Sequence, residues 1–318
     1  MNPSEVPRPD EQREPSRKEY FERLKEHALT ELRHRYEKHE DGLGVFPVED
    51  DRVLDFHTSF HTEDIIRRTK TILETIKEVC PELVDKTAVE DGEIAAAFHD
   101  IVQECEAETI LSGNGNGLDF KIIRKRESGK NELASVRIAL NFLDRLEEET
   151  GGKLFSAKSR EHITEAILAT VPSFEDGTVV QKNITEQSSP VARALALADI
   201  GAAGMDGPEA FNTAGDALFR EDNIDITKAV AERELLSERT KTYFASRMKN
   251  WTRDQIAFAE GRKKLFEIEI APLPKPAQDA VRAVFSKFEK TIESAKAYAE
   301  KRAPMSFKEL IIDFGYSV

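Results

Sequence analysis

The sequence predicts an all-α fold, and two observations carry that prediction. Apolar residues recur at helical spacing over most of the 318 residues, whereas the strict alternation typical of strands is nearly absent, as are internal repeats. A chain of this length buries most of its apolar surface without disulfide or metal staples. Its 2 cysteines are too few for a disulfide framework, which indicates a reducing compartment.

Charge and apolar content limit the classes of partner. Lys plus Arg number 46 and Asp plus Glu number 60, which gives a formal net charge of −14. Proteins that coat nucleic acid or bind anionic membranes need a positive field, so we expect neither function. No apolar run is long enough for a spanning helix, and the first residues do not resemble a signal peptide. We therefore expect a soluble, cytoplasmic protein.

The N-terminal region divides into an arm and a helix. Residues 1–16 contain four prolines among charged residues and too little apolar content to order the chain, so we expect a disordered arm. A helix is predicted over 18–39 because apolar residues follow at every fourth position: Tyr20, Leu24, Ala28, Leu32 and Tyr36.

Two apolar helices come next. The first begins near Thr62 with acidic residues that suit the positive end of a helix dipole, and it ends before Pro81. The second covers 93–102, with IAAAF followed directly by His99 and Asp100. Because this short helix is apolar on all sides, we expect it at the centre of the fold.

A long polar insert follows at 104–130, with SGNGNG interpreted as a flexible turn. Helices are predicted again over 131–150, 156–170 and 190–203. The loop between the last two, which contains FEDGTVVQKNITEQSS, is long enough to suggest a functional lid.

The C-terminal part is predicted to be helical throughout. A helix over 208–219 precedes a very long one over 226–268, and the sequence APLPKPA separates it from a last helix over 278–301. We interpret 17–270 as one helical domain and 271–318 as a C-terminal helical extension, which is a candidate surface for homo-oligomers.

The histidines fall into two groups. His27, His34, His39 and His162 lie among charged residues, which is typical of a solvated surface. His57 and His61, by contrast, are spaced i, i+4 at a predicted helix start, and the His99–Asp100 pair ends an apolar helix. Burying such groups is costly unless another charge compensates.

Asp199 presents the same problem at the end of the apolar run VARALALAD. A divalent cation would compensate two carboxylates, and two imidazoles would complete its ligand set from three separate helices. Such a set leaves coordination positions open for water and substrate, as a catalytic metal site requires.

The order His61, His99–Asp100, Asp199 resembles the H…HD…D signature of the HD-domain metal-dependent phosphohydrolases. Within that superfamily, FHTSFHTEDI is similar to a YHNxxHxxDV opening, AAAFHDIV to AAWFHDIVY, and the segment from Asn131 to Ser135 to NExxS. LADIGAAG with the later LFRED is a looser copy of a DxDLxxLG motif and its following arginine segment.

The resemblance implies an HD-domain-like helical bundle with an added N-terminal helix and C-terminal helices. It implies that His61, His99, Asp100 and Asp199 bind one divalent metal ion: Mn²⁺, Fe²⁺, Mg²⁺, Co²⁺ or Zn²⁺. Val171 and Pro172 stand where the family often carries a histidine, which weakens the case for a second ion without deciding between one and two. Leu197 is a separate departure, because it replaces the first aspartate of DxD. The implied reaction is hydrolysis of a phosphate ester or anhydride of a nucleotide or similar small metabolite.

Further catalytic and binding residues are less strongly indicated. Asp100 and Glu104 are the expected catalytic carboxylates, since Glu104 falls where related HD hydrolases carry an acid beside the metal. Glu104 is equally consistent with an exposed loop residue, and Glu132 with a base or with the start of a helix. Expected to meet substrate are His57, Arg67, Arg68, Lys121, Arg124, Lys182 and Arg193, although a solvated loop also explains the basic run around Arg124.

Two other classes of function compete with a hydrolase. The added helices favour a catalytically silent HD-fold module for ligand sensing or protein interaction. A di-iron oxygenase is disfavoured because it needs more histidine ligands than the chain offers. Fold resemblance alone does not identify the substrate.

Overall fold

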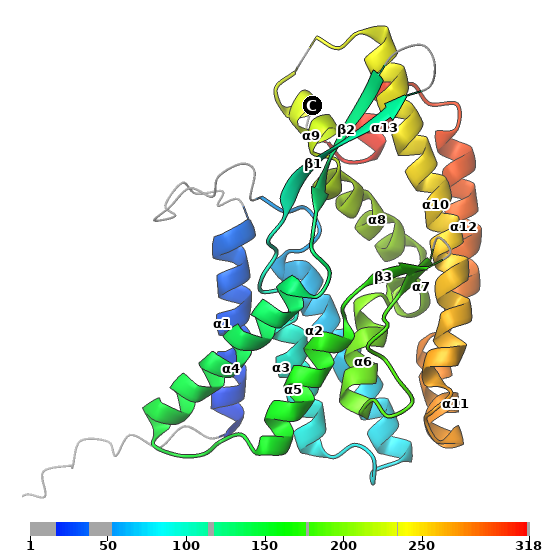
Figure 1. Ribbon diagram of the computed structural model, residues 1–318. Coiled ribbons are helices and arrows are strands. Elements are labelled where there is room, and N and C mark those ends of the chain that lie inside the picture. Colours follow the sequence, from blue (N-terminus) through cyan, green and yellow to red (C-terminus); the bar gives the residue numbers. More distant parts are fainter. Residues whose placement is uncertain (1–16, 38–52, 114–117, 176–177, 234, 317–318) are drawn as a thin grey trace, which may run out of the picture.

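The computed structural model describes residues 17–37, 53–113, 118–175, 178–233 and 235–316. Within these ranges the protein is mainly helical, which confirms the predicted class (Figure 1). The proposed disordered arm, 1–16, lies outside the described residues. No described helix combines the length and the apolar character needed to cross a membrane.

Four helices form the centre of the fold: α2 (Ser59–Val79), α3 (Lys86–Phe98), α5 (Ala157–Ala169) and α6 (Pro190–Asp199). All four begin at a side-chain N-cap, which accepts a hydrogen bond from the first turn: Thr58, Asp85, Ser156 and Ser189. Residues 94–98 of α3 are entirely buried, so the all-round apolar helix is central as predicted.

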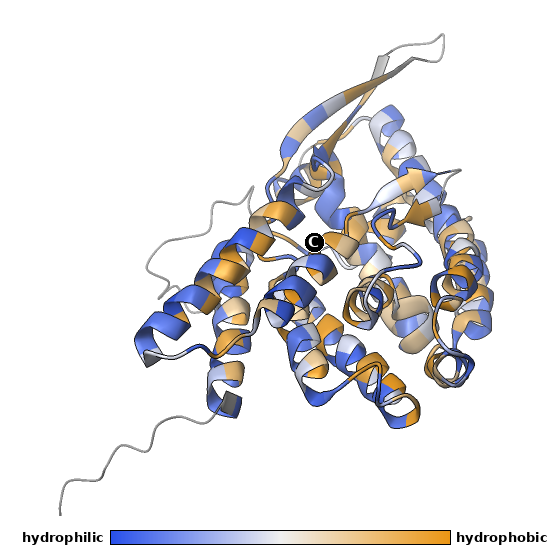
Figure 2. Ribbon diagram, turned by 60° about the horizontal axis from the view of Figure 1, so that its bottom comes forward, coloured by the Kyte–Doolittle hydropathy of each residue, from blue (hydrophilic) through white to orange (hydrophobic). Residues whose placement is uncertain are grey.

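Helices α1 (Arg17–Tyr36) and α4 (Lys130–Thr150) cover this centre. The predicted stripe on α1 is confirmed, because Leu24, Ala28 and Leu32 are fully buried. Helix α4 starts after Gly129, whose φ of 82° lies in the left-handed region that favours glycine. Figure 2 shows the apolar residues of these helices turned toward one another, with polar residues outside.

The insert contains the main departure from prediction. It forms an antiparallel hairpin, β1 (Glu106–Gly113) and β2 (Leu118–Lys125), which lies in the upper part of the molecule in Figure 1. The sequence indicated only a polar insert and predicted no strands here, because the strand formers in ETIL and FKII are mixed with charges on both faces and no apolar alternation marks them. The proposed lid carries a second short hairpin, β3 (Ser173–Glu175) and β4 (Thr178–Val180).

The long helices predicted in the C-terminal part are interrupted. The expected helix over 190–203 is α6 followed by the short α7 (Ala202–Met205), and α8 (Pro208–Asp222) follows that turn. The expected helix over 226–268 is instead α9 (Ile224–Ala231) and α10 (Glu238–Ile270). The chain turns between them at Arg233, the one described non-glycine residue with a positive φ, 52°.

The last predicted helix is also two: α11 (Lys275–Val284) and α12 (Phe288–Arg302), followed by α13 (Phe307–Asp313). The break places Phe285 and Phe288 against Gly204, where a Cβ atom would meet both rings at 2.5–2.8 Å. The helix is therefore broken at this turn, where packing of the two aromatic rings on Gly204 stabilises the chain.

The C-terminal elements pack on α8, α9 and α10 through a second apolar core that includes Phe219, Phe244, Leu310 and Phe314. Arg302 joins this core at 2% exposure, and its guanidinium pairs with Asp216 and Asp313. The polar partners of Arg302 thus fix the end of α12 against α8 and α13.

Candidate metal centre

The structure brings His61, His99, Asp100 and Asp199 together, although they come from three separate helices. One ligand atom from each side chain lies within 4.8 Å of all the others. Ligands bonded to one ion at about 2.0–2.3 Å are separated by about 3 to 4.6 Å. The geometry therefore matches a single cation with little rearrangement.

Helix ends place these four side chains. His61 lies in the first turn of α2, where Thr58 caps the helix. His99 is the C-cap of α3 and Asp100 follows it, while Asp199 is the last residue of α6. Polar residues at the ends of apolar helices thus reach a common point without interrupting the core.

Two buried nitrogen atoms carry the strongest indication of a ligand. His61 Nε2 and His99 Nε2 are buried and have no hydrogen-bond partner. His99 Nδ1 lies 2.7 Å from the carbonyl oxygen of Ala96. A carbonyl only accepts, so Nδ1 carries the proton and donates it, which leaves the Nε2 lone pair directed at the two carboxylates.

Each imidazole nitrogen faces both carboxylates. His99 Nε2 lies 3.0 Å from Asp100 Oδ2 and 3.6 Å from Asp199 Oδ1. His61 Nε2 lies 3.6 Å and 3.8 Å from the same two oxygen atoms. Two partly buried carboxylates and two neutral imidazoles carry a charge of −2, which a divalent cation neutralises.

The electrostatics of the protein without an ion show the same demand for positive charge. Burial alone would lower the pKa of His61 and His99, but the contacts and charges of Asp100 and Asp199 outweigh it and raise both values. Burial would raise the pKa of each carboxyl group, yet the two histidines lower it. The two carboxylates therefore favour a positive charge at this point, which a divalent cation would supply.

Two glutamines hold the ligand carboxylates from outside. Gln103 Nε2 donates to Asp100 Oδ1 at 2.9 Å. Gln181, which follows β4, is 5% exposed and places Nε2 3.5 Å from Asp199 Oδ2. Its Oε1 is buried without a partner. The proposed lid therefore contributes a polar group to the site, which its loop-like sequence did not indicate.

Glu104 and Glu132, the two carboxylates considered beside the ligands, lie in different surroundings. The side chain of Glu104 is 69% exposed, and Lys130 Nζ lies 3.9 Å from it. Glu132 is half-buried, and its Oε2 has no hydrogen-bond partner. Burial raises the pKa of Glu132, and the nearby charges of Asp100 and Asp199 raise it further. Glu132 is therefore close enough to Asp100 and Asp199 to sense their charges, whereas Glu104 points to solvent.

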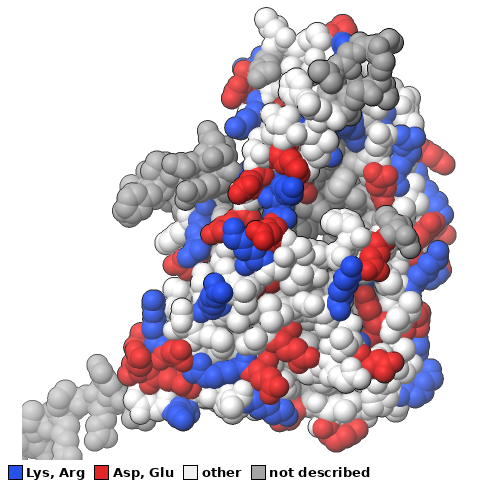
Figure 3. All heavy atoms as spheres, in the orientation of Figure 1, with Lys and Arg blue, Asp and Glu red and all other residues white. Residues whose placement is uncertain are grey.

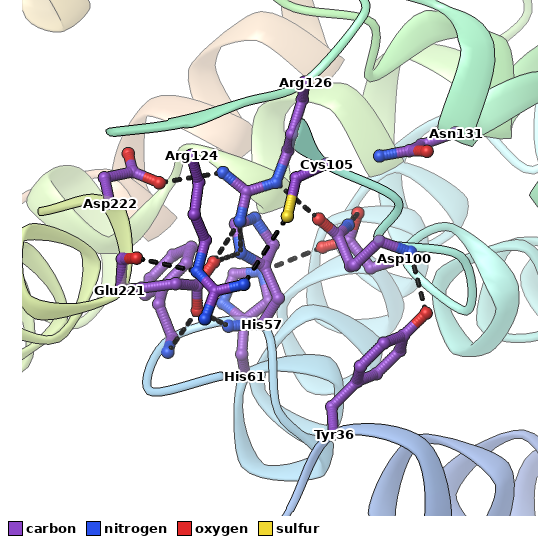
Figure 4. Close-up of polar contacts among 12 residues, drawn as sticks. Tyr36, His57, His61, Asp100, Cys105, Arg124, Arg126, Asn131, Glu221 and Asp222 are labelled. Atoms are coloured by element: carbon purple, nitrogen blue, oxygen red, sulfur yellow. Dashed lines mark hydrogen bonds and ion pairs between the residues drawn. The ribbon is translucent and has the colours of Figure 1, made fainter. Parts of the chain in front are cut away.

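His57 lies beside the ligand cluster and outside it. Its ring centroid is 5.9 Å from that of His61, and its Nδ1 lies 2.5 Å from Glu221 Oε1 (Figure 4). Glu221 Oε2 also accepts from the backbone nitrogen atoms of Phe56 and His57 at 2.8 and 3.0 Å. Glu221, which belongs to the LFRED segment, thus fixes the chain before α2.

The other residues expected to meet substrate lie in varied settings. Arg68 and Arg193 are buried. Arg68 donates to the Asp206 carboxylate and to the carbonyl of Ala198. Arg193 donates to the carbonyls of Thr185 and Glu269. These hydrogen bonds hold neighbouring segments together, so either arginine would have to give them up in order to bind a substrate. Arg67 also binds Asp206, and Lys182 pairs with Glu175. Arg124 donates to the carbonyls of Glu221 and Val53. Lys121 lies on β2.

The surface around the insert is mixed in charge. On the face shown in Figure 3, basic and acidic side chains of the described residues alternate over the hairpin and α4. A groove of about 2260 Å³ runs between α1, the hairpin and α9, and its lining includes Arg35, Arg124, Glu127 and Glu232. It does not include the four candidate ligands.

Glu221 gives a prediction for acid stability. Burial would raise its pKa, but His57, Arg126 and the Phe56 N–H lower it from 4.5 to about 2. Since the folded-state pKa is lowered, this group stabilises the protein fully above pH 4.5 and loses its contribution as the pH falls toward 2. The difference corresponds to about 3 kcal/mol.

We therefore expect Glu221→Gln to lower the free energy of unfolding at pH 7, with the deficit relative to wild type shrinking between about pH 4.5 and about pH 2. Urea unfolding of both proteins across this range measures it. A deficit that stays constant with pH would show that Glu221 acts through packing and not through its charge.

Comparisons with known proteins find no relative: no family model matches the chain, nor does any curated protein or solved structure at a significant level. The chemistry of the site is therefore the guide to its function.

Proposed function

We propose that the protein is a metal-dependent phosphohydrolase that cleaves a phosphate ester or anhydride, of a nucleotide or a similar small metabolite, with one divalent ion held by His61, His99, Asp100 and Asp199. The observation that carries the proposal is the pair of buried, partnerless Nε2 atoms facing two carboxylates. The order of these residues resembles the HD-domain phosphohydrolase signature, which supports the same reaction.

The donor set fits a catalytic ion better than a structural one. Two imidazoles and two carboxylates are ligands that Mn²⁺, Fe²⁺, Co²⁺ and Zn²⁺ accept, and they leave positions open. When bound, the ion would polarise a phosphoryl oxygen and lower the pKa of a bound water.

The protein's own groups have distinct tasks in this proposal. Ala96 O holds His99 in the tautomer that presents Nε2, and Gln103 and Gln181 orient the two carboxylates. Glu132 accepts the proton of the attacking water, since its Oε2 has no hydrogen-bond partner and its pKa is raised by burial and by the nearby charges of Asp100 and Asp199. Asp100 serves as a metal ligand and shares the proton of the water with Glu132.

A substrate screen tests the proposal. The full chain is loaded in turn with Mn²⁺, Mg²⁺, Co²⁺, Fe²⁺ or Zn²⁺ and assayed for phosphate or pyrophosphate release from mono-, di-, tri- and cyclic nucleotides and p-nitrophenyl phosphate. We expect turnover with at least one substrate that is lost on chelation and restored by the same ion. Absence of turnover in folded, metal-loaded protein would favour the silent module instead.

A further inference from the structure

We propose that Arg126, which follows the insert hairpin, is a positioning residue that orients the Asp100 carboxylate through Gln103. The inference rests on the proposed metal centre and adds a residue to it. Arg126 follows β2 directly, so the insert itself reaches the site. Figure 4 shows its guanidinium between Asp100 on one side and, on the other, the acidic pair Glu221 and Asp222 at the end of α8.

All three nitrogen atoms of the Arg126 guanidinium have acceptors. Nη1 donates to Asp222 Oδ1 at 2.8 Å, Nη2 donates to Glu221 Oε1, and Nε donates to Gln103 Oε1 at 2.9 Å. Glu221 is fully buried as a side chain, so its charge needs a partner, and Arg126 and His57 provide it. The acidic pair therefore fixes the guanidinium, and the remaining edge is presented to Gln103.

The chemistry of arginine determines which way the Gln103 amide points. A guanidinium only donates, so the oxygen Oε1 must face Arg126. The amide nitrogen Nε2 must then face the other way, where it donates to Asp100 Oδ1 at 2.9 Å. The backbone N–H of Gln103 donates to the Tyr36 hydroxyl at 2.8 Å, which holds the residue in place. Removing Arg126 would free the amide to rotate.

This chain of hydrogen bonds selects which Asp100 oxygen is free for a metal. Oδ1 is occupied by Gln103, and Oδ2 is the atom that lies 3.0 Å from His99 Nε2 and 3.6 Å from His61 Nε2. Asp100 is thereby prepared to bind through a single oxygen. Groups that orient metal ligands in this way are worth about 10- to 100-fold in metal affinity.

Arg124 provides a matched control on the same hairpin. Its guanidinium donates to the carbonyl of Glu221 at 2.9 Å and to that of Val53 at 3.2 Å. It therefore docks the hairpin on the same helix, while the hydrogen bond to Gln103 belongs to Arg126. A comparison of Arg124→Met with Arg126→Met separates docking of the hairpin from orientation of Asp100.

The test measures the affinity of the full chain for Mn²⁺ by calorimetric titration. We expect Arg126→Met and Gln103→Leu each to weaken binding by about 10- to 100-fold, with Arg124→Met close to wild type. The double variant Arg126→Met/Gln103→Leu should bind Mn²⁺ no more weakly than Gln103→Leu alone, because both changes interrupt the same chain of hydrogen bonds to Asp100. Melting of the metal-free proteins verifies folding. If Arg126→Met does not fold, Arg126→Lys takes its place, since it keeps the charge beside Glu221 and Asp222.

Three results would overturn the inference: unchanged Mn²⁺ affinity in Arg126→Met, additive losses in the double variant, or equal losses in Arg124→Met and Arg126→Met. These outcomes require a wild-type protein that binds Mn²⁺. Wild-type protein that binds none of the ions named above would overturn the metal centre, and this inference with it.

Discussion

Asp199→Ala is expected to abolish turnover and to remove most of the metal affinity while the protein remains folded. Asp199 supplies one of the two negative charges of the site, so its loss leaves a bound divalent ion with an uncompensated charge of +1. If the ion contributes about 4 kcal/mol of transition-state stabilisation, the loss corresponds to about a 1000-fold decrease in kcat/KM.

Stability should change much less than activity in this variant. The carboxylate is partly exposed at the end of α6, and its removal opens no cavity in the apolar core. Thermal melts with and without Mn²⁺, together with the hydrolysis assay, measure both effects. Asp144→Ala, which removes an exposed carboxylate on α4, is the control. Wild-type turnover or undiminished stabilisation by Mn²⁺ in Asp199→Ala would remove Asp199 from the site.

Glu132→Gln is expected to reduce kcat by about 100- to 10,000-fold while the affinity for Mn²⁺ is kept. The amide keeps the shape of the side chain but cannot accept a proton from water. Burial and the charges of Asp100 and Asp199 raise the pKa of Glu132, so wild-type kcat should rise with pH through a value above that of an ordinary glutamate. The variant should lack this step.

Glu104→Gln is the matched control, because Glu104 follows the same motif and is largely exposed. We expect this variant to retain wild-type kcat and the same pH profile. The opposite result, a large loss of kcat in Glu104→Gln and none in Glu132→Gln, would show that Glu104 is the base. The exposed Glu104 side chain, which lies near Lys130, would then have to move toward the ligands.

The four candidate ligands were accessible from the sequence for a physical reason. His99, Asp100 and Asp199 are polar groups at the ends of apolar runs, where burial without compensation is costly, and the resemblance to the HD signature added His61. His57 lies about one turn before His61 and outside the group of four, and its partner is Glu221. That partner lies 164 residues away, and nothing in the LFRED segment indicates which helix start it would meet.

Contacts between distant segments account for most of what the sequence left open. Glu104 and Glu132 have similar local patterns, and only packing shows that the first is exposed and the second half-buried. The basic run of the insert contains several candidates, and strand register decides that Arg126 reaches Gln103. The breaks in the long C-terminal helices likewise depend on Phe285 and Phe288 packing on Gly204.

The central claim is that one divalent ion binds to His61, His99, Asp100 and Asp199. Crystals grown with Mn²⁺ and measured for anomalous scattering test it most directly. The account predicts one peak about 2.0–2.3 Å from both Nε2 atoms, from Asp100 Oδ2 and from an Asp199 oxygen. Anomalous density located elsewhere, or none at this point in protein saturated with Mn²⁺, would contradict it.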